Sequence, residues 1–361
     1  MIRVQAPGKL FIAGEYAVVE PGEPAVLVAV DRYVTVELSE SHDRGRISSE
    51  QYGRLPVVWT REDDRVVADQ DHRPFDYVFS AVTTLEQLVA ERRLTPRFYD
   101  IRISSELDDV SGRKFGLGSS AAVTVATVRA LDEFYGLGLG PVERFKLALL
   151  ATVRVSPNAS GGDIAACTFG GWIAYSAPDR ADVLAAWRAE GVSATLAHDW
   201  PGFSVRRLRE PEGLRLVVGW TGQPASTERL VGSVQHRKAP EETHYAAFLA
   251  DSRACVRALV AALEAQDAPA ASAALRRARA VLGDLASRAG LEIETPALTA
   301  LCESAAEIGA AAKSSGAGGG DCGIVLAPAG ADVGRMLREW EQHDIRHLAV
   351  EVHEAKEAIV S

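Results

Sequence analysis

The first part of the chain alternates between the apolar spacing of strands and that of helices. Residues 33–38 place an apolar side chain at every second position, which is the repeat of a half-buried strand. Residues 75–92 instead carry valines and leucines three or four positions apart, so they are predicted to form an amphipathic helix. Short apolar runs at 2–5, 10–13 and 98–103 are predicted to be further strands.

The pattern changes after Pro178, where helical spacing dominates. Helices are predicted at 181–190, 241–265, 270–289, 296–311 and 331–343, with strands between them at 214–220, 323–326 and 347–352. A chain of 361 residues is longer than one hydrophobic core usually supports. We therefore predict an α+β fold with two lobes, residues 1–178 and 179–361, which fold as one unit.

The charge balance limits which partners the protein can bind, and the cysteine pattern indicates its cellular compartment. The chain has 39 Lys and Arg residues against 49 Asp and Glu residues, and this acidic balance disfavours nucleic acid and anionic membranes as partners. The four cysteines are far apart and lack the spacing of a metal site. Because no signal peptide or membrane-spanning run is evident, a cytoplasmic location with reduced thiols is expected.

The strongest local motif is a glycine- and serine-rich loop before a predicted helix. Residues 116–122 read Gly-Leu-Gly-Ser-Ser-Ala-Ala. Glycines let the backbone approach a phosphate closely, and a helix N-terminus adds N–H donors and partial positive charge. The loop matches neither the Walker A nor the Rossmann spacing. Taken alone, it is explained equally well by a serine N-cap after a flexible turn.

Two further loops have compositions that suit a ligand site. Residues 314–321 read Ser-Ser-Gly-Ala-Gly-Gly-Gly-Asp and lead directly into an apolar strand, which favours a tight turn beside a ligand over a linker. Residues 158–163 read Asn-Ala-Ser-Gly-Gly-Asp before a short helix. The carboxylate of Asp163 could cap this helix or serve as a general base, and the loop alone does not distinguish the two roles.

These three loops, together with Ala-Pro-Gly-Lys-Leu-Phe-Ile-Ala-Gly-Glu-Tyr at residues 6–16, resemble the ordered motifs of the GHMP kinase superfamily along almost the whole chain. The resemblance implies a ribosomal-protein-S5-like N-terminal lobe and a ferredoxin-like α/β-plait C-terminal lobe. It also implies ATP as phosphoryl donor, Mg²⁺ as cofactor and a small molecule as acceptor. Related kinases are monomers or homodimers.

Within the superfamily the chain is most similar to bacterial phosphomevalonate kinases. It carries Gly-Glu-Tyr at 14–16, where mevalonate kinases usually carry Gly-Glu-His. It departs from the superfamily at Arg113 and Lys114, which replace a proline often found before the second motif. The implied reaction transfers the γ-phosphoryl group of ATP to 5-phosphomevalonate. A mevalonate kinase and a catalytically inactive GHMP-fold ligand-binding protein are the alternatives.

The resemblance also assigns roles to individual residues. Lys9 is expected to stabilise negative charge during transfer, Asp163 to act as base or orienting group, and Ser120 to bind Mg²⁺. The residues expected to bind ATP are Lys114, Gly116, Leu117, Gly118, Ser119, Ser120 and Ala121. Those expected to bind the acceptor are Lys9, Tyr16, Asn158, Ser160, Gly161, Ser226, Ser315, Gly316, Ala317 and Gly318.

A phosphorylated acceptor would need more positive charge around it than mevalonate. Lys114 is the first candidate, because it precedes the phosphate loop. The further candidates are Arg154, Lys313, Arg237 and Lys238. Among the predicted acceptor contacts, Tyr16 has a second interpretation, because a tyrosine after two short strands is more often part of the core.

Overall fold

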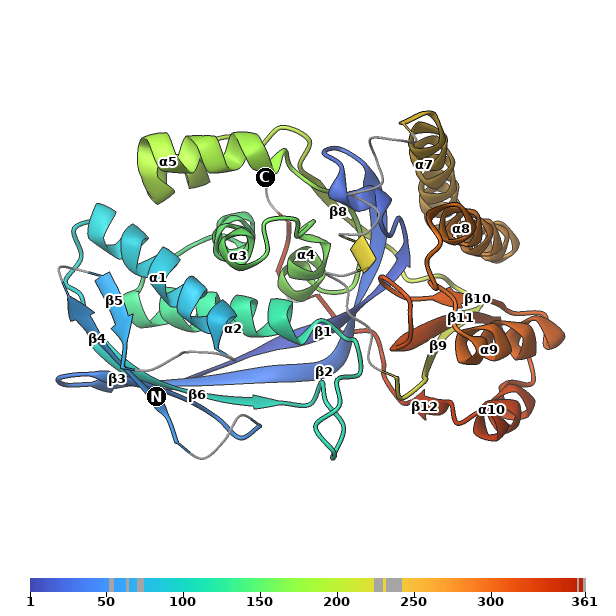
Figure 1. Ribbon diagram of the computed structural model, residues 1–361, viewed down its shortest axis with the longest axis horizontal. Coiled ribbons are helices and arrows are strands. Elements are labelled where there is room, and N and C mark those ends of the chain that lie inside the picture. The colour runs from blue at the N-terminus through green and yellow to red at the C-terminus, as the bar shows by residue number, and fades with distance from the viewer. Residues whose placement is uncertain are drawn as a thin grey trace.

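The computed structural model describes residues 1–51, 55–62, 65–69, 75–223, 230–231, 242–355 and 357–359. Its strands form two sheets, one of eight strands and one of four, so the predicted two-lobed α+β fold is confirmed (Figure 1). Among the helices of these residues, none combines the length and apolar character needed to cross a bilayer.

The large sheet follows the order β5-β4-β3-β6-β2-β7-β8, and β1 pairs with β2 beside this path. All neighbouring strands are antiparallel except β3 and β6. The long pair β1 and β2 runs across the molecule towards the small lobe (Figure 1). The strands are β1 (Ile2–Ala13), β2 (Pro24–Ser41), β3 (Gly45–Ser49), β4 (Val57–Glu62), β5 (Arg65–Ala68), β6 (Phe98–Ser105), β7 (Trp172–Ser176) and β8 (Ser204–Leu208).

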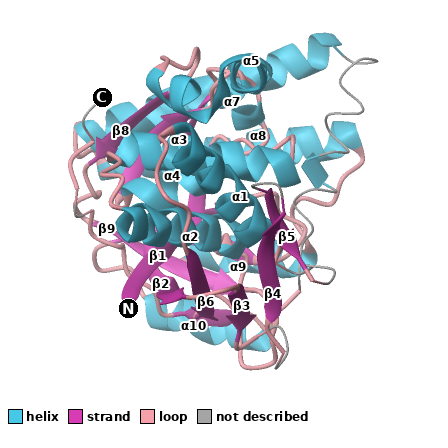
Figure 2. Cartoon of the chain, turned by 90° about the vertical axis from the view of Figure 1, so that its left-hand side faces the viewer, coloured by secondary structure: helices cyan, strands magenta, loops and turns pink. Residues whose placement is uncertain are grey.

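A layer of helices covers one face of this sheet, as Figures 1 and 2 show from two directions. The amphipathic helix predicted at 75–92 is α1, and its predicted apolar stripe is buried. The helices on this face are α1 (Asp76–Glu91), α2 (Ser119–Tyr135), α3 (Pro141–Val155) and α4 (Gly162–Phe169). A fifth helix, α5 (Arg180–Ala197), packs on α1 and α3, farther from the sheet (Figure 1).

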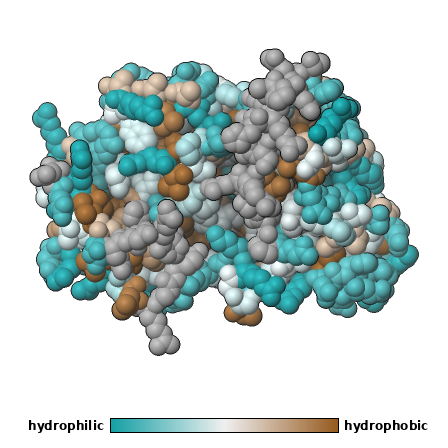
Figure 3. Space-filling view, viewed as in Figure 1, coloured by the Kyte–Doolittle hydropathy of each residue, from teal (hydrophilic) through white to brown (hydrophobic). Residues whose placement is uncertain are grey.

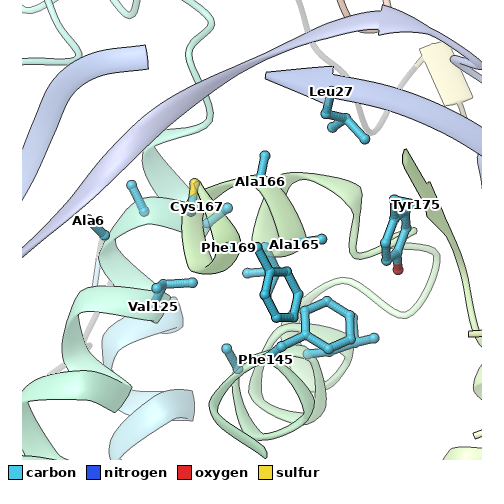
Figure 4. Close-up of a cluster of buried hydrophobic side chains, with 14 of the residues drawn as sticks. Ala6, Leu27, Val125, Phe145, Ala165, Ala166, Cys167, Phe169 and Tyr175 are labelled. Atoms are coloured by element: carbon cyan, nitrogen blue, oxygen red, sulfur yellow. The ribbon is translucent and has the colours of Figure 1, made fainter. Parts of the chain in front are cut away.

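Aromatic side chains fill the core between α3, α4 and the sheet (Figure 4). Phe145 of α3 stacks on Phe203 with ring centroids 4.8 Å apart, and it also lies beside Phe169 of α4 and Tyr175 of β7. Rings of this size each remove a large apolar area from water. The packing therefore fixes α4, whose first turn carries Asp163, against β7.

The small lobe is built on an antiparallel sheet in the order β10-β11-β9-β12, the strand order of a ferredoxin-like plait. Its core includes Leu301 of α9 and Met336 and Trp340 of α10, while hydrophilic residues dominate the outer surface there (Figure 3). The elements are β9 (Leu214–Trp220), α7 (Glu242–Glu264), α8 (Ala268–Ala289), α9 (Pro296–Glu307), β10 (Ala311–Ser314), β11 (Cys322–Pro328), α10 (Val333–Gln342) and β12 (Arg346–Leu348).

The large sheet continues past residue 178, where the sequence places the lobe boundary. β8 pairs with β7, and the small sheet begins only with β9, so the change of sheet lies between Leu208 and Leu214. The composition of β8 hides its strand character, because Arg206 and Arg207 are exposed and only Leu208 is buried. Charged residues of this kind are usual on the last strand of a sheet.

The residues after β12 return to the large lobe. The strand predicted at 347–352 ends at Leu348, and Val352 then forms a bridge with Val30 of β2. His353 donates its backbone N–H to the carbonyl of Ala29 at 2.9 Å and accepts one from Gly171 at 2.8 Å. The C-terminal segment thus joins the two lobes a second time.

Candidate functional site

The predicted phosphate loop lies at the N-terminus of α2, against β1. The backbone N–H of Lys9 donates to the carbonyl of Leu117 at 2.9 Å, which ties the loop to the strand. Gly118 is the N-cap of α2 with a φ of 80°, so Ser119 and Ser120 form the first turn. The first N–H groups of a helix have no acceptor within it. Together with the helix dipole, they make this loop suitable for binding an anion.

The side chain of Lys9 runs along this loop and ends beside Asp163. A Cβ on Gly118 would lie 2.7 Å from Lys9 Cε, so a larger residue here would displace the lysine, and the φ of 80° also favours glycine. Lys9 Nζ lies 3.4 Å from Asp163 Oδ1, and the two side chains are 7% and 36% exposed. The ammonium group is therefore almost buried, while its carboxylate partner remains open on one side.

The loop before α4 is held in place by β7. Tyr175 donates its hydroxyl hydrogen to the carbonyl of Ser160 at 2.7 Å, and Ser160 Oγ accepts from the backbone N–H of Gly162 at 3.3 Å. Gly161 is buried as the N-cap of α4, whereas Asn158 is exposed. This arrangement brings Ser160 and Gly161 close to Asp163 and leaves Asn158 on the surface.

The third glycine-rich loop contacts both β1 and the phosphate loop. Ser315 Oγ accepts from the backbone N–H of Phe11 at 2.9 Å and donates to its carbonyl at 3.0 Å. At the other end of the loop, Cys322 Sγ donates to the carbonyl of Phe115 at 2.9 Å. Asp321 lies so close to Gly116 that a Cβ on this glycine would be 2.6 Å from the Cβ of Asp321. The loop therefore supports the phosphate loop from the small lobe.

Tyr16 occupies the buried position of a core tyrosine. It is 3% exposed and belongs to a cluster with Tyr245 and Phe248, and its hydroxyl donates to the carbonyl of Ala317. Burial raises the pKa of this hydroxyl, and the charge of Glu15 raises it further. Tyr16 thus holds the third glycine-rich loop in place through Ala317. Contact with an acceptor stays a prediction for both residues.

The candidate cations lie in different surroundings. Lys313 was a candidate for binding the acceptor phosphate. It is instead fully buried and forms an ion pair with Glu15. Lys114 is exposed beside the phosphate loop, and Arg154 is exposed with its guanidinium 5.6 Å from the ring centroid of Trp187. Ser226, Arg237 and Lys238 lie outside the described residues.

One residue near the site gave no signal in the sequence. Arg180, the first residue of α5, donates to the carbonyl of Val19 at 2.8 Å and to that of Ala159 at 3.3 Å. It therefore joins the segment after Tyr16 to the loop before Asp163, and burial lowers the pKa of its guanidinium. An arginine after a helix N-cap is too common for this bridge to be predicted from sequence.

The oxygen atoms of the site suit a magnesium ion that is held mainly by phosphates. Ser120 places a partly exposed hydroxyl in the first turn of α2. In the part of the chain that the structure describes, no three His, Cys, Asp or Glu side chains gather as a metal cluster. Mg²⁺ in kinases is usually bound by one or two protein oxygens plus substrate phosphates and water. The hydroxyl of Ser120 fits this pattern.

Comparison with known proteins agrees with this geometry. Residues 76–171 match the family model of the GHMP kinases N terminal domain, and residues 259–345 match that of the GHMP kinases C terminal domain. A phosphomevalonate kinase from Streptomyces sp. strain CL190 is 49% identical over 93% of this chain and 93% of its own. A mevalonate kinase from Thermococcus sibiricus is 29% identical over 91% of this chain and 89% of its own.

A solved structure also superimposes on nearly the whole chain. Streptococcus pneumoniae phosphomevalonate kinase in complex with phosphomevalonate and AMPPNP is 30% identical, with a TM-score of 0.86 over 98% of this chain and 100% of that one. Agreement at this level extends over both lobes.

Proposed function

Because this chain belongs to the GHMP kinase family, we propose that it transfers the γ-phosphoryl group of ATP to 5-phosphomevalonate, releasing ADP and 5-diphosphomevalonate. The observation that carries the proposal is the 49% identity to a phosphomevalonate kinase over 93% of both chains. The protein is then an ATP-dependent phosphotransferase with a phosphate group as acceptor, and it acts in the mevalonate route to isoprenoids.

ATP binds with its phosphates at the N-terminus of α2. The backbone N–H groups of Gly118, Ser119 and Ser120 donate to phosphate oxygens, since they have no acceptor within the helix. Lys114 adds positive charge from its exposed position beside the loop. The hydroxyl of Ser120 would hold Mg²⁺ together with the phosphates, and the ion would supply neutralisation of phosphate charge.

Lys9 and Asp163 align and stabilise the transferred group. Phosphoryl transfer depends mainly on positioning and on stabilisation of negative charge, which an almost buried ammonium group provides. A phosphate monoester has a second pKa of about 6, so the acceptor is largely ionised at neutral pH and needs no strong base. Asp163, 3.4 Å from Lys9 Nζ, therefore serves chiefly to hold the ammonium group in position.

We place the enzyme in the cytoplasm, where ATP is available, as a monomer or homodimer. The four cysteines are free and buried, which suits a reducing compartment. Light scattering on the purified protein measures the oligomeric state. Fractionation of cells that produce the protein measures its location.

An acceptor screen tests the proposed reaction. The purified protein is incubated with ATP, Mg²⁺ and either 5-phosphomevalonate or mevalonate, and the product is identified by mass. We expect ADP and 5-diphosphomevalonate with the first acceptor and no turnover with the second. Turnover of mevalonate alone would identify a mevalonate kinase, and nucleotide binding without any turnover would identify an inactive binding protein.

A further inference from the structure

The two lobes meet at a seam formed by residues 11–16 of the large lobe and 313–317 of the small lobe. Three side-chain interactions cross this interlobe seam. Ser315 binds both backbone groups of Phe11, Tyr16 donates to the carbonyl of Ala317, and Lys313 pairs with Glu15. Residues about 300 positions apart in the chain are thus joined at one place.

The ion pair in the seam is almost completely shielded from solvent. The side chains of Lys313 and Glu15 are 0% and 3% exposed, and the ammonium also donates to the carbonyl of Ser314 at 2.6 Å. Removing two charges from water cancels much of their attraction, so a buried pair adds little net stability compared with apolar side chains. Its directional hydrogen bonds instead favour one relative placement of the two strands that carry it.

The seam lies between the groups that must be aligned for phosphoryl transfer. On the large-lobe side, Lys9 is two residues before Phe11 on β1. On the small-lobe side, the loop that begins at Ser315 ends at Asp321, which contacts the phosphate loop at Gly116. A shift at the seam would therefore move the support of the phosphate loop relative to Lys9.

We propose that Lys313 and Glu15 are positioning residues for phosphoryl transfer, holding the third glycine-rich loop in register with Lys9. Neither side chain touches a substrate, since both are enclosed by the seam. The inference rests on the proposed kinase activity. In this proposal, the turnover rate depends on how the two lobes are placed relative to each other.

A double-mutant cycle tests this proposal with E15Q, K313M and the E15Q/K313M double variant. The double variant carries no unpaired buried charge, so it remains testable if a single variant fails to fold. Residues that act as a unit have non-additive effects, so the single and double variants should lose similar amounts of activity. We expect each soluble variant to lower kcat by about tenfold and to change the KM for ATP by less than about twofold. Normal kcat in the folded double variant would overturn the proposal.

A matched pair far from the site provides the control. Arg61 and Glu86 form another well-buried ion pair, 2.9 Å apart with side chains 12% and 7% exposed, between β4 and α1. The R61M/E86Q variant is expected to shift the unfolding midpoint and keep kcat. If it lowers kcat as much as E15Q/K313M does, the effect is general destabilisation and the positioning role is wrong. Failure of the wild-type protein to phosphorylate any acceptor would instead overturn the proposed function.

Discussion

The region around Lys9 and the region around Lys313 each bury a lysine beside a carboxylate, yet they leave it very different access to a ligand. Asp163, the partner of Lys9, is 36% exposed, and the pair lies beside a helix N-terminus with free N–H donors. Glu15, the partner of Lys313, is 3% exposed and Lys313 is 0% exposed, so this pair has almost no access to solvent. A buried lysine with an acidic partner is therefore not in itself a sign of catalysis. The exposed fraction of the carboxylate partner distinguishes a lysine that can reach a ligand from one that joins two lobes.

Replacing Lys9 by methionine tests the open pair and has the largest expected effect. We expect kcat to fall by about 10³-fold, because a group that stabilises charge in the transition state is lost. Asp163 can regain water, so the thermal midpoint should change little. Steady-state kinetics and a melting curve measure both. The control is R3M on the same strand, whose side chain is 64% exposed, and a K9M variant with nearly normal kcat would show that Lys9 has no catalytic role.

Replacing Lys313 by methionine tests the closed pair. We expect the free energy of unfolding to fall by about 3–5 kcal/mol, because Glu15 is left as an unpaired buried charge. Urea denaturation measures this loss, and the E15Q/K313M double variant should recover most of it. A K313M protein as stable as wild type would mean that the seam opens to water.

Replacing Asp163 by asparagine separates its two possible roles. As a positioning partner of Lys9, Asp163 should contribute about 10²-fold to kcat, since small misplacements of a reacting group have effects of this size. The acid limb of the pH profile should stay near the second pKa of the acceptor, about 6, in both proteins. Disappearance of that limb in D163N would identify Asp163 as a general base.

Replacing Glu294 by glutamine gives the smallest effect and extends the comparison to a partly exposed pair. Burial raises the pKa of Glu294, but the hydrogen bond and charge of Arg279 outweigh it and hold the pKa below its ordinary value. A depressed pKa stabilises the fold above the unfolded value of about 4.3, and this stability is lost as the pH falls through the lower folded value.

The wild-type protein should therefore lose up to about 1 kcal/mol more stability than E294Q in acid. Urea denaturation at neutral and acid pH measures the difference. The exposed pair of Glu307 and Arg335 supplies the control variant E307Q, for which no such difference is expected. Equal acid sensitivity of wild type and E294Q would show that this pair is not linked to stability.

Local chemistry was sufficient to predict the backbone of the phosphate loop and the helix that follows it. The glycines and serines at 116–122 predict a turn into a helix, and α2 does begin at Ser119 after a left-handed Gly118. The apolar stripe of α1 is likewise a property of one short segment. These features depend on neighbours in sequence, which is why spacing and composition identify them.

The role of Lys313 could not be predicted in the same way. The partner of Lys313 is 298 residues away, and nothing in the glycine-rich run distinguishes a lysine that faces a ligand from one that faces another lobe. β8 was missed for a related reason, because a sheet edge tolerates exposed arginines. Long-range packing decides each of these cases.

The return of the C-terminal segment to the large lobe limits how this protein can be divided. A fragment ending before β9 would contain the phosphate loop, Lys9 and Asp163, yet it would lack Val352 and His353, which bind the backbone of β2 and the turn before β7. The large lobe therefore depends on this segment for part of the backbone pairing of its sheet. Fusion partners are better attached at the N-terminus, where Met1 is 91% exposed, than close to the end of this returning segment.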